Sequence, residues 1–519
     1  MSYGRVYLIG AGPGEPTLIS VRGLRYLNAA DVVVHDHLVH HRQLRSIRPD
    51  AERIDVGATA PQPLAQDAIG FLLADKAREG KSVARLKWGD PFIFDSGGKE
   101  ALFLHKHGIP FEVVPGVPPT IGGPCFAGVP LTYPEAGDAL VFIRGHDASS
   151  PPDVDWDRLA QLRGSVVSYA GGAQLETIID QLLSHGRSAD EPAALIIHGT
   201  LPTQRTIQGT LREVHEVVRE AQHRGSAVLV VGPVVGFREY LRWFDSRPLF
   251  GKRVVVTRAQ DQAAEMVDLL LELGADPIEA PTIRIEPPDD YGPLDAACAE
   301  IGSFDWVVFT SVNGVESFMT RLLNGARDVR SLGQVRLCAI GPATAARLAR
   351  YGLRVDLVPQ EHRAEAVFDA LRQVERLPGR RILLPRTDLA REELATSLAQ
   401  AGAEVREVTA YRTVLAGSDR DGGPDVYKML LEQEVDVVTF TSASTVRNFV
   451  KILGSGPAAD LLQTTLVASI GPITAEAAAE LGIKTTIMPP TYTIPALVDA
   501  IAEHFADSND NRSETGAHP

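Results

Sequence analysis

The sequence predicts an α/β protein built from two bodies, and two observations lead to this prediction. Short apolar runs repeatedly end in glycine, serine or threonine, as strands of open α/β sheets do where they lead into helices. At residues 247–258 (RPLFGKRVVVTR), a loop with Pro248 and Gly251 separates the apolar run 227–235 from a new run at 254–256. A chain of 519 residues is too long for one hydrophobic core, so we expect one α/β body on each side of this loop.

The composition is that of a globular protein, with 44% hydrophobic and 23% charged residues. The formal net charge of −15 argues against broad binding to nucleic acids or anionic membranes. Cys125, Cys298 and Cys338 lie far apart, in no metal-ligand or redox spacing, which is typical of a reducing cytoplasm. The N-terminus lacks a signal-peptide layout, and no apolar run approaches the roughly 18 residues of a membrane helix. We expect a cytoplasmic protein whose tail, residues 507–519, is disordered.

The first body opens with a predicted strand at residues 6–9 that runs into a glycine-rich turn (GAGPGEP). Such a turn lets a ligand lie against the backbone at the carboxyl end of the strand. A second strand, at residues 32–35, ends in Asp36, where a ribose-binding acid would fall in a dinucleotide-binding unit. However, the glycine spacing is GxGxG, and Pro13 and Pro16 each remove an amide donor that a pyrophosphate would need. A nucleotide-like ligand without phosphates fits this turn better.

Further turns rich in glycine and proline follow the other predicted strands of the first body. In chain order they are KWGDPFIF at 87–94, VVPG at 113–116, AGVPLT at 127–132, VVSYAG at 166–171 and HGT at 198–200. In this order, and over nearly all of residues 5–240, the first body resembles the tetrapyrrole methylases, most closely uroporphyrinogen-III C-methyltransferase. The resemblance implies two α/β lobes with S-adenosylmethionine (SAM) bound between them, and assembly as a homodimer.

The resemblance also implies roles for individual residues. Asp36 would be the catalytic acid that manages pyrrole protons. The residues that would bind SAM are Pro13, Gly89, Asp90, Ile93, Ala170 and Gly199. Without the family, Asp36 is equally well interpreted as the polar residue that ends a strand.

Four histidines surround Asp36 in the sequence, namely His35, His37, His40 and His41. They raise the question of a metal site, but no cysteine or further acid completes a persuasive ligand set. Solvated loop histidines are the better interpretation, so no metal is expected in this protein.

The chain departs from the methylase pattern at several positions. Trp88 stands where the family has the first glycine of a Gly-Gly-Asp motif, and Ala170 stands where it has methionine. Pro118 and Pro119 replace a Thr-Ser or Thr-Ala pair, and Ala58 replaces a lysine. An indole in place of glycine fills space in a pocket, and alanine cannot donate a proton as lysine can.

The second body contains an internal repeat. The stretch DWVVFTSVNGVESF at 305–318 matches DVVTFTSASTVRNF at 436–449, and AIGPATA at 339–345 matches SIGPITA at 469–475. Each copy places hydroxyls and free amides just after apolar runs, at strand ends and helix starts that hold anions well. Helix capping alone explains any one of these residues equally well. The duplicated set, however, predicts two facing rims that bind a large polyanion.

With the repeated motifs, the stretches VTR at 256–258 and YRT at 411–413 make residues 252–506 resemble uroporphyrinogen-III synthase. The resemblance implies one lobe from residues 251–283 and 415–506 and another from residues 284–414. It also implies a reaction without a cofactor, in which hydroxymethylbilane loses its terminal hydroxyl and closes with its last ring inverted. Catalysis is then mostly control of shape, helped by one weak acid.

Tyr411 matches the tyrosine of the synthase family and is expected to be this acid, because a phenol near pKa 10 keeps its proton at neutral pH. On spacing alone, Tyr411 is equally well a half-buried strand aromatic. The arginines expected near substrate carboxylates are Arg258, Arg386 and Arg412. The substrate-binding residues expected are Arg258, Thr310, Ser311, Asn313, Thr441, Ser442, Ser444, Gly471 and Thr474.

The implied product of the second body, uroporphyrinogen III, is the implied substrate of the first, so fusion would concentrate a labile intermediate. We expect a methylase domain (1–245), a linker (246–251) and a synthase domain (252–506). The methylase would add methyl groups at C2 and C7 to give precorrin-2, toward sirohaem and cobalamin. Two alternatives remain: a synthase whose methylase body no longer methylates, and a non-catalytic module that binds a tetrapyrrole or SAM.

Overall fold

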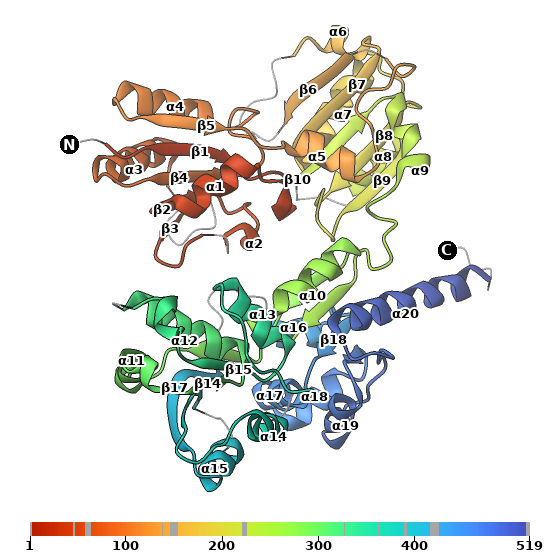
Figure 1. Ribbon diagram of the computed structural model, residues 1–519. Helices are drawn as coiled ribbons and strands as arrows, with labels where there is room; N and C mark the ends of the chain where they lie inside the picture. The colour runs from red at the N-terminus through yellow and green to blue at the C-terminus, as the bar shows by residue number, and fades with distance from the viewer. Residues whose placement is uncertain are drawn as a thin grey trace. The chain divides into compact units, whose positions relative to one another are not determined.

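The structure is a computed structural model that describes residues 3–44, 47–57, 64–137, 139–145, 154–220, 226–325, 327–361, 364–388, 392–415 and 425–514. The chain divides into two compact units. The first contains Met1–Arg253, Leu269–Asp276 and Ala502–Pro519, and the second contains Val254–Asp268 and Pro277–Ile501. Four β-sheets with flanking helices confirm the predicted α/β class (Figure 1). No helix among the described residues is both long and apolar enough to cross a membrane.

The first sheet has five parallel strands in the order β3-β2-β4-β1-β5. Alternate residues of a strand face opposite sides, and here both sides are covered, by α3 and α4 on one face and α1 on the other. The strands are β1 (Val6–Gly10), β2 (Val32–His35), β3 (Glu52–Asp55), β4 (Val83–Lys87) and β5 (Phe111–Val114). The helices are η1 (Pro16–Leu18), α1 (Val21–Ala29), α2 (His41–Leu44), α3 (Gln66–Arg78) and α4 (Gly97–Lys106).

The second sheet is mixed, in the order β6-β7-β10-β8-β9, with β6 and β7 parallel and the other pairs antiparallel. The apolar run at 227–235 was predicted as one strand, but β10 ends at Val231 and a short helix follows from Pro233. The strands are β6 (Ala139–Gly145), β7 (Gly164–Gly171), β8 (Pro192–Ile197), β9 (Arg205–Thr210) and β10 (Ser226–Val231). The helices are α5 (Pro119–Phe126), α6 (Trp156–Ala160), α7 (Gly172–Ser184), α8 (Leu211–Glu220), η2 (Pro233–Phe237) and α9 (Arg238–Leu241).

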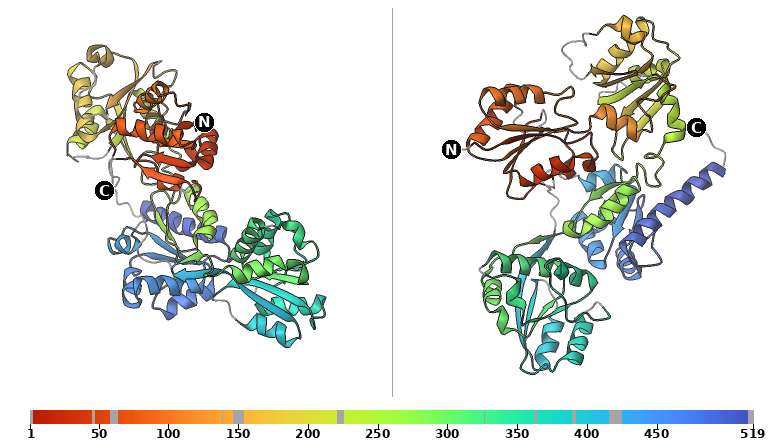
Figure 2. Two further views of the ribbon diagram at one scale, coloured as in Figure 1. Left: turned by 90° about the vertical axis from the view of Figure 1, so that its left-hand side faces the viewer. Right: turned by 45° about the horizontal axis from the view of Figure 1, so that its top comes forward.

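The second unit contains two further sheets, with the orders β12-β11-β18-β19 and β13-β17-β16-β14-β15. The larger sheet is covered by α11, α12 and α13 on one face and by α14 and α15 on the other (Figure 2). The smaller sheet comprises β11 (Arg253–Val256), β12 (Asp276–Glu279), β18 (Val437–Phe440) and β19 (Leu466–Ser469). The larger comprises β13 (Ile283–Glu286), β14 (Trp306–Phe309), β15 (Arg336–Ala339), β16 (Arg381–Thr387) and β17 (Glu404–Leu415).

The helices of these two lobes follow their strands closely in the chain. Those of the larger sheet are α11 (Gly292–Ala299), η3 (Ile301–Ser303), α12 (Val312–Asn324), η4 (Val329–Leu332), α13 (Pro342–Arg350), α14 (Ala364–Val374) and α15 (Glu393–Gln400). Those that follow β11 and β17 are α10 (Gln260–Glu272), α16 (Val426–Leu431), α17 (Ala443–Leu453), α18 (Ser455–Leu461), α19 (Pro472–Glu480) and α20 (Ile494–Glu514).

The internal repeat is reproduced in the packing of both lobes. Phe309 and Phe318 form an edge-to-face pair with ring centroids 5.5 Å apart, and Phe440 and Phe449 repeat it at 5.4 Å. In both lobes the amide that follows the next strand donates to the carbonyl of the first phenylalanine, at 3.0 and 2.9 Å. The two lobes are therefore copies of one supersecondary unit.

Helix α20 corrects one expectation about the C-terminus. The segment from Asp507 was expected to be disordered, but the helix continues to Glu514, while residues 515–519 lie outside the described part. Ile494, Leu497, Val498 and Ile501 are buried and anchor its first turns. Once nucleated, a helix adds each further residue at little cost, so it extends into polar sequence.

Candidate functional site

The glycine turn after β1 and the turn after β4 meet at the carboxyl edge of the first sheet. The Gly89 amide donates to the Gly12 carbonyl at 2.8 Å, and the Gly12 amide donates back to Gly89 at 3.2 Å. Both residues have positive φ, +83° and +72°, which favours glycine. Pro13 follows Gly12, and Trp88 precedes Gly89. The bridge therefore holds Pro13 and Trp88 at the same edge of the sheet.

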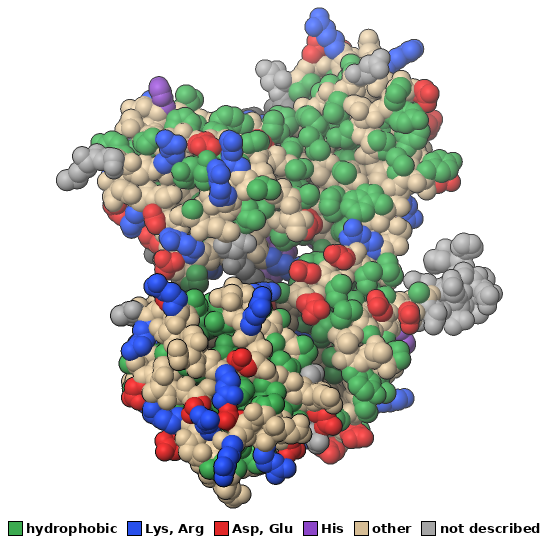
Figure 3. Space-filling model, viewed as in Figure 1, with side chains coloured by type: hydrophobic (Ala, Val, Ile, Leu, Met, Phe, Trp, Pro, Cys, Tyr) green, Lys and Arg blue, Asp and Glu red, His purple; other side chains and the backbone are tan. Residues whose placement is uncertain are grey.

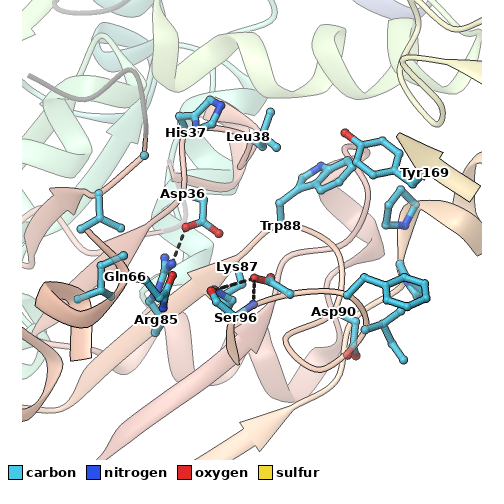
Figure 4. A pocket seen from close by; sticks show the side chains of 18 of the residues that line it. Asp36, His37, Leu38, Gln66, Arg85, Lys87, Trp88, Asp90, Ser96 and Tyr169 are labelled. Carbon is cyan, nitrogen blue, oxygen red and sulfur yellow. Dashed lines mark hydrogen bonds and ion pairs between the residues drawn. The ribbon is translucent and has the colours of Figure 1, made fainter. Parts of the chain in front are cut away.

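A cavity of about 330 Å³ lies at this edge, and we call it the first cavity (Figure 4). Its wall combines carboxylates, a buried hydroxyl and aromatic rings. The lining residues that matter below are Asp36, Trp88, Ile93, Asp95, Thr120 and Tyr169. Tyr169 comes from the second sheet and Thr120 from α5, which packs on that sheet, while Asp36, Trp88, Ile93 and Asp95 come from loops of the first sheet. Both lobes of the first unit therefore contribute to the site.

Charged side chains form a largely buried network in the wall of the first cavity. Arg85 and Lys87 lie two residues apart on β4 and so share one face of the strand. Arg85 Nη2 lies 2.5 Å from Asp36 Oδ1, and Arg85 Nε lies 3.3 Å from Glu100 Oε1. Lys87 Nζ lies 3.0 Å from Asp95 Oδ1 and 3.2 Å from Glu100 Oε1. Both cations are 1% exposed and fully engaged, whereas the Asp36 and Asp95 side chains are 24% and 22% exposed.

The environment shifts the two cavity carboxyls in opposite directions. Burial opposes ionisation of Asp36, but Arg85 and Lys87 outweigh it and hold the Asp36 pKa below its ordinary value. Burial raises the pKa of Asp95, and the nearby Asp36 charge adds to this rise, while Lys87 opposes it. Environments that push two carboxyl pKa values apart are typical of acid–base sites. Asp36 is therefore the carboxyl whose ionised form is the more strongly stabilised.

A second cavity, of about 240 Å³, adjoins the first. It is lined largely by backbone and apolar groups, including Pro13, Gly14, Gly123, His198 and Gly199. The two cavities share Leu38, Trp88, Pro119 and Tyr169. The Trp88 and Tyr169 rings are in contact, with centroids 4.8 Å apart and planes tilted by 47°. This aromatic pair therefore stands where the two cavities meet.

The structure brings most of the predicted SAM-binding residues to these two cavities. Pro13 and Gly199 line the second cavity, and Asp90 and Ile93 line the first. The Asp90 carboxylate accepts the amides of Phe92 at 2.8 Å and Gly116 at 2.9 Å, so it also holds its own loop in place. Gly89 lines neither cavity and serves the bridge between the two turns.

Ala170 is the exception among the predicted residues. Its side chain is fully buried in the core of the second sheet, and it lines neither cavity. The neighbouring Tyr169 lines both, because successive strand residues face opposite sides of a sheet. Sequence reasoning missed Tyr169 because β7 is buried on both faces and shows no polar alternation. Ala58 lies outside the described residues.

Thr120 is a further residue that the sequence reasoning missed. Its side chain is 2% exposed and lines the first cavity, yet its Oγ1 has no hydrogen-bond partner in the described part of the chain. Buried polar groups are normally paired, so this hydroxyl is available to a bound ligand. It comes directly after Pro118 and Pro119, which replace the Thr-Ser or Thr-Ala pair of the methylase pattern.

Among the described residues, one group of side chains at the surface of the first unit could hold a metal ion. Ligand atoms of Glu176, Asp180 and His215 lie within 4.8 Å of one another on α7 and α8. Arg219 Nε lies 3.8 Å from Glu176 Oε1 and competes for this carboxylate. The histidines around Asp36 do not form such a group.

In the second unit, the predicted acid and a predicted substrate residue lie together. Tyr411, on β17, is 6% exposed, and its Oη lies 2.9 Å from Ser311 Oγ. Ser311 follows β14 and caps α12, and its Oγ accepts the Gly314 amide at 2.9 Å. The Ser311 hydroxyl keeps its proton and a second lone pair, so it can either donate to Tyr411 or accept from it. Thr310 and Asn313 flank Ser311 and are partly buried.

Burial raises the pKa of the Tyr411 phenol above its ordinary value. The Ser311 hydrogen bond lowers it, and the charge of the nearby Asp388 raises it. The phenol thus keeps its proton at neutral pH, while the serine stabilises the phenolate that proton donation would leave. Sequence reasoning had not identified Asp388.

The smaller sheet places its predicted residues at the equivalent carboxyl edge. Thr441 and Ser442 follow β18, and Ser442 with Thr445 forms a capping box at the start of α17. The Ser444 hydroxyl lies 2.8 Å from the Ser442 hydroxyl. Gly471 follows β19 and starts α19 without a side-chain cap, which leaves amides free for an anion. The Thr474 side chain is 4% exposed, so its side chain is largely withdrawn from this rim.

The three predicted arginines differ in what they already bind. Arg386 forms an ion pair with Glu407, and Arg412 lies 3.2 Å from Glu286 and Asp289. Arg258 Nε donates to the side-chain oxygen of Gln262 at 3.2 Å, a neutral partner. Of the three, Arg258 therefore has the most charge left for a substrate carboxylate, in agreement with its place after β11.

Comparison with known families supports both halves of the chain. A family model described as Tetrapyrrole (Corrin/Porphyrin) Methylases matches residues 5–215, and one described as Uroporphyrinogen-III synthase HemD matches residues 264–499. The fold and these matches define a fusion of a tetrapyrrole C-methyltransferase body with a uroporphyrinogen-III synthase body, as the sequence predicted.

One curated relative matches nearly the whole chain. A "Porphyrin biosynthesis protein HemD" of Ruminiclostridium josui is 33% identical over 510 residues, which cover 97% of this chain and 98% of the relative. The chain belongs to this family of HemD porphyrin biosynthesis proteins. A "Uroporphyrinogen-III C-methyltransferase" of Bacillus subtilis is 34% identical over 73% of this chain and 78% of its own length. A Thermus thermophilus uroporphyrin-III C-methyl transferase, solved with S-adenyl homocysteine, matches 45% of this chain and 93% of its own at 35% identity, with a TM-score of 0.39.

Proposed function

We propose that the second unit converts hydroxymethylbilane to uroporphyrinogen III with inversion of the last ring. We further propose that the first unit methylates this product at C2 and C7 with SAM to give precorrin-2. The Ser311–Tyr411 pair at the carboxyl edge of the larger sheet is the observation that most strongly supports the synthase half. The methylase half is supported by the family and by Asp36, an ionised carboxylate on a cavity wall.

In the proposed synthase reaction, Tyr411 donates its proton to the terminal hydroxyl of hydroxymethylbilane. The C–O bond breaks with its electron pair on oxygen, water leaves, and the pyrrole nitrogen lone pair forms the azafulvene. The last ring then attacks at its substituted position and rearranges through a spiro intermediate. The closing ring releases a proton, which returns to the phenolate. Ser311 acts by donating to this phenolate while it is charged.

The substrate of this reaction carries many carboxylates, and the rims of the second unit suit them. Ser311, Ser442 and Gly471 stand at strand ends where helices begin, which present amides and the positive ends of helix dipoles. With Arg258, we propose these groups as carboxylate contacts. We propose the other predicted residues near the same strand ends as further substrate contacts: Thr310, Asn313, Thr441, Ser444 and Thr474.

In the methylase half, the residues around the two cavities fit SAM. Gly122 and Gly199 let the wall of the second cavity pack closely: a Cβ at Gly122 would come within 2.6 Å of Pro13, and one at Gly199 within 2.9 Å of Gly123. The unpaired Thr120 hydroxyl offers a donor or acceptor in the first cavity. When bound, SAM would supply an electrophilic methyl group. Asp36 would take the ring proton that is lost as the methyl group is gained.

A second candidate function keeps the synthase but not methylation. The Arg85 and Lys87 cations on the wall of the first cavity are 1% exposed and engaged by acids, whereas the Asp36 and Asp95 carboxylates on the same wall are partly exposed. Such a wall attracts a polycarboxylate poorly. In this candidate the first unit binds its ligand without transferring a methyl group.

One experiment separates these functions. The full chain is incubated with hydroxymethylbilane, with and without SAM, and the oxidised products are resolved by chromatography and mass spectrometry. Type III uroporphyrin without SAM and a dimethylated product with SAM are expected. Type III product with no methylation under the same conditions favours the second candidate. A type I product at the uncatalysed rate contradicts the synthase proposal.

We also propose the domain division 1–245, 252–506, a cytoplasmic location and a homodimer through the first unit.

Hydrophobic side chains gather around α5 on the visible face of this unit (Figure 3). Ile121, Leu241 and Trp243 are 43%, 46% and 42% exposed, and with Cys125 and Leu131 they line a hollow of about 430 Å³. Large exposed apolar patches are typical of interfaces. Trp243→Glu is expected to yield a monomer in light scattering, and an unchanged mass would contradict this interface.

A further inference from the structure

The junction of the two cavities in the first unit has a composition that the methylase pattern does not explain. Trp88 stands where that pattern has glycine, and its indole lies against the phenol ring of Tyr169, 4.8 Å between centroids. Both side chains are partly exposed and line both cavities (Figure 4). Two aromatic rings therefore border the passage from one cavity to the other.

The two cavities differ in the chemistry that they offer. The second is lined mainly by glycines and apolar groups, with His40 and His198 as well, and its lining has no carboxylate, which suits a nucleoside and its aliphatic arm. The first has Asp36 and Asp95 on its wall. If SAM fills the second cavity and reaches Asp90 and Ile93 in the first, with the tetrapyrrole in the rest of the first cavity, the sulfonium lies where the cavities meet.

A sulfonium carries a positive charge but no N–H or O–H group. It therefore cannot be held by donating a hydrogen bond to a carboxylate. Aromatic faces can, because the ring quadrupole attracts a cation within about 6 Å of the ring centre. The local charge also suits a cation, since the two cations Arg85 and Lys87 face the three carboxylates Asp36, Asp95 and Glu100. In the product, S-adenosylhomocysteine, the sulfur is neutral. Neither the aromatic faces nor the local negative charge therefore stabilises it.

We propose that Trp88 and Tyr169 form a sulfonium-binding pair that distinguishes SAM from S-adenosylhomocysteine. The inference rests on the proposed methyltransferase function and deepens it by naming the group that recognises the reactive end of the cofactor. The pair binds the cation before transfer and loses its attraction once the methyl group has left, which favours product release. On this basis the indole takes part in binding and is not an obstruction.

The test compares the dissociation constants of SAM and S-adenosylhomocysteine for the full-length protein by isothermal titration calorimetry. The wild type is expected to bind SAM more tightly. In Trp88→Leu and in Tyr169→Leu, this preference is expected to fall about two- to thirty-fold, as loss of one cation–π contact implies. Trp88→Phe and Tyr169→Phe keep an aromatic face and are expected to retain most of the preference.

Trp156→Leu is the matched control, because Trp156 packs on the core of the second sheet and lines neither cavity. It is expected to leave the preference unchanged. A SAM preference that survives both Trp88→Leu and Tyr169→Leu overturns the sulfonium pair, and so does faster methyl transfer in Trp88→Leu. If a leucine variant fails to fold, an analogue with a protonated amine in place of the sulfonium replaces it as the probe. Wild-type protein should bind this amine more tightly than S-adenosylhomocysteine, and weaker binding overturns the proposal.

The same titrations separate this inference from the function on which it rests. Wild-type protein that binds neither SAM nor S-adenosylhomocysteine contradicts the proposed methyltransferase and the pair together. Protein that binds both, with a preference that does not depend on the two rings, contradicts the pair alone.

Discussion

Ser311 Oγ lies 2.9 Å from Tyr411 Oη, and the same serine oxygen accepts the Gly314 amide at 2.9 Å. While Tyr411 is neutral, either hydroxyl can donate in the first contact, but once Tyr411 has lost its proton only Ser311 can donate. The Ser311 contact therefore favours the ionised form of Tyr411 and lowers its pKa, whereas burial favours the neutral form and raises the pKa. This balance suits a group that must release a proton and then recover it.

Tyr411→Phe removes the proposed acid but keeps the aromatic ring. We expect the rate of uroporphyrinogen III formation to fall about 10²- to 10⁴-fold, the usual contribution of a positioned acid. Because hydroxymethylbilane closes without inversion in water, the share of type I product should rise. Isomer-resolved chromatography of the oxidised products measures both effects. An unchanged rate with type III product retained would remove Tyr411 from its role.

Ser311→Ala removes the donor to Tyr411. A neutral hydrogen bond is worth about 0.5–1.5 kcal/mol, so we expect the synthase rate to fall roughly tenfold or less. The Tyr411 pKa should rise further, which moves the alkaline limb of the rate profile to higher pH. The substitution also costs a helix cap, about 1 kcal/mol of stability. Asp425→Ala, which removes the cap of α16 away from this site, should show the stability loss without the kinetic one.

Asp36→Asn leaves the buried Arg85 with Glu100 as its remaining acid partner. We expect methyl transfer to fall about 10²- to 10⁴-fold and the free energy of unfolding to fall by about 1–3 kcal/mol at pH 7. The folded-state pKa of Asp36 is lowered, so its stabilisation is present above the ordinary pKa near 3.9 and disappears as the pH falls through the lower folded value.

The difference in stability between wild type and Asp36→Asn should therefore be largest near neutral pH and shrink toward pH 3. Denaturant unfolding of both proteins at several pH values measures this difference. A gap that widens as the pH falls would contradict the assigned ion pair. The synthase rate serves as an internal control, since Asp36 has no role in that unit.

The three cysteines should differ sharply in reactivity. Burial raises the pKa of the Cys298 thiol to about 11 and that of Cys338 to about 12, whereas Cys125 is exposed. Because the thiolate is the reactive form, a thiol reagent near pH 8 should modify Cys125 quickly and the other two slowly when the proposed interface is open, as in the Trp243→Glu monomer. Spectrophotometric titration should count one fast thiol in this folded monomer and three after unfolding. Cys125→Ser should abolish the fast phase.

The sequence was sufficient to locate most strand ends, because an apolar run followed by a polar residue marks where a buried strand stops. Asp36, Ser311 and Ser442 were found in this way, and all three follow strands. Arg85 and Lys87 were not singled out, because charged residues in a strand are normally exposed and their partners lie on other elements. The sequence pointed to Ala170, whereas the structure places Tyr169 at the cavities. The reason is related: a strand buried on both faces carries no polar alternation that would show which residues face the site.

Thr120 and the Ser311–Tyr411 contact illustrate a different limit. The hydroxyl of Thr120 became notable through its lack of a partner, which is a property of packing and not of spacing. Ser311 and Tyr411 lie 100 residues apart, and each was proposed for its own motif. Only the register of β14, β16 and β17 brings them together.

The pairing of β11 with β18 has a consequence for how the polypeptide is made. Val254 and Val437 are partners in neighbouring strands, and the whole larger sheet lies between them in the chain. During synthesis the inserted lobe emerges complete before β18, the partner of β11, has been made. The inserted lobe can therefore fold first. The interrupted lobe has to close a very long loop before its central strands meet, and this closure should set the slowest step in maturation of the protein.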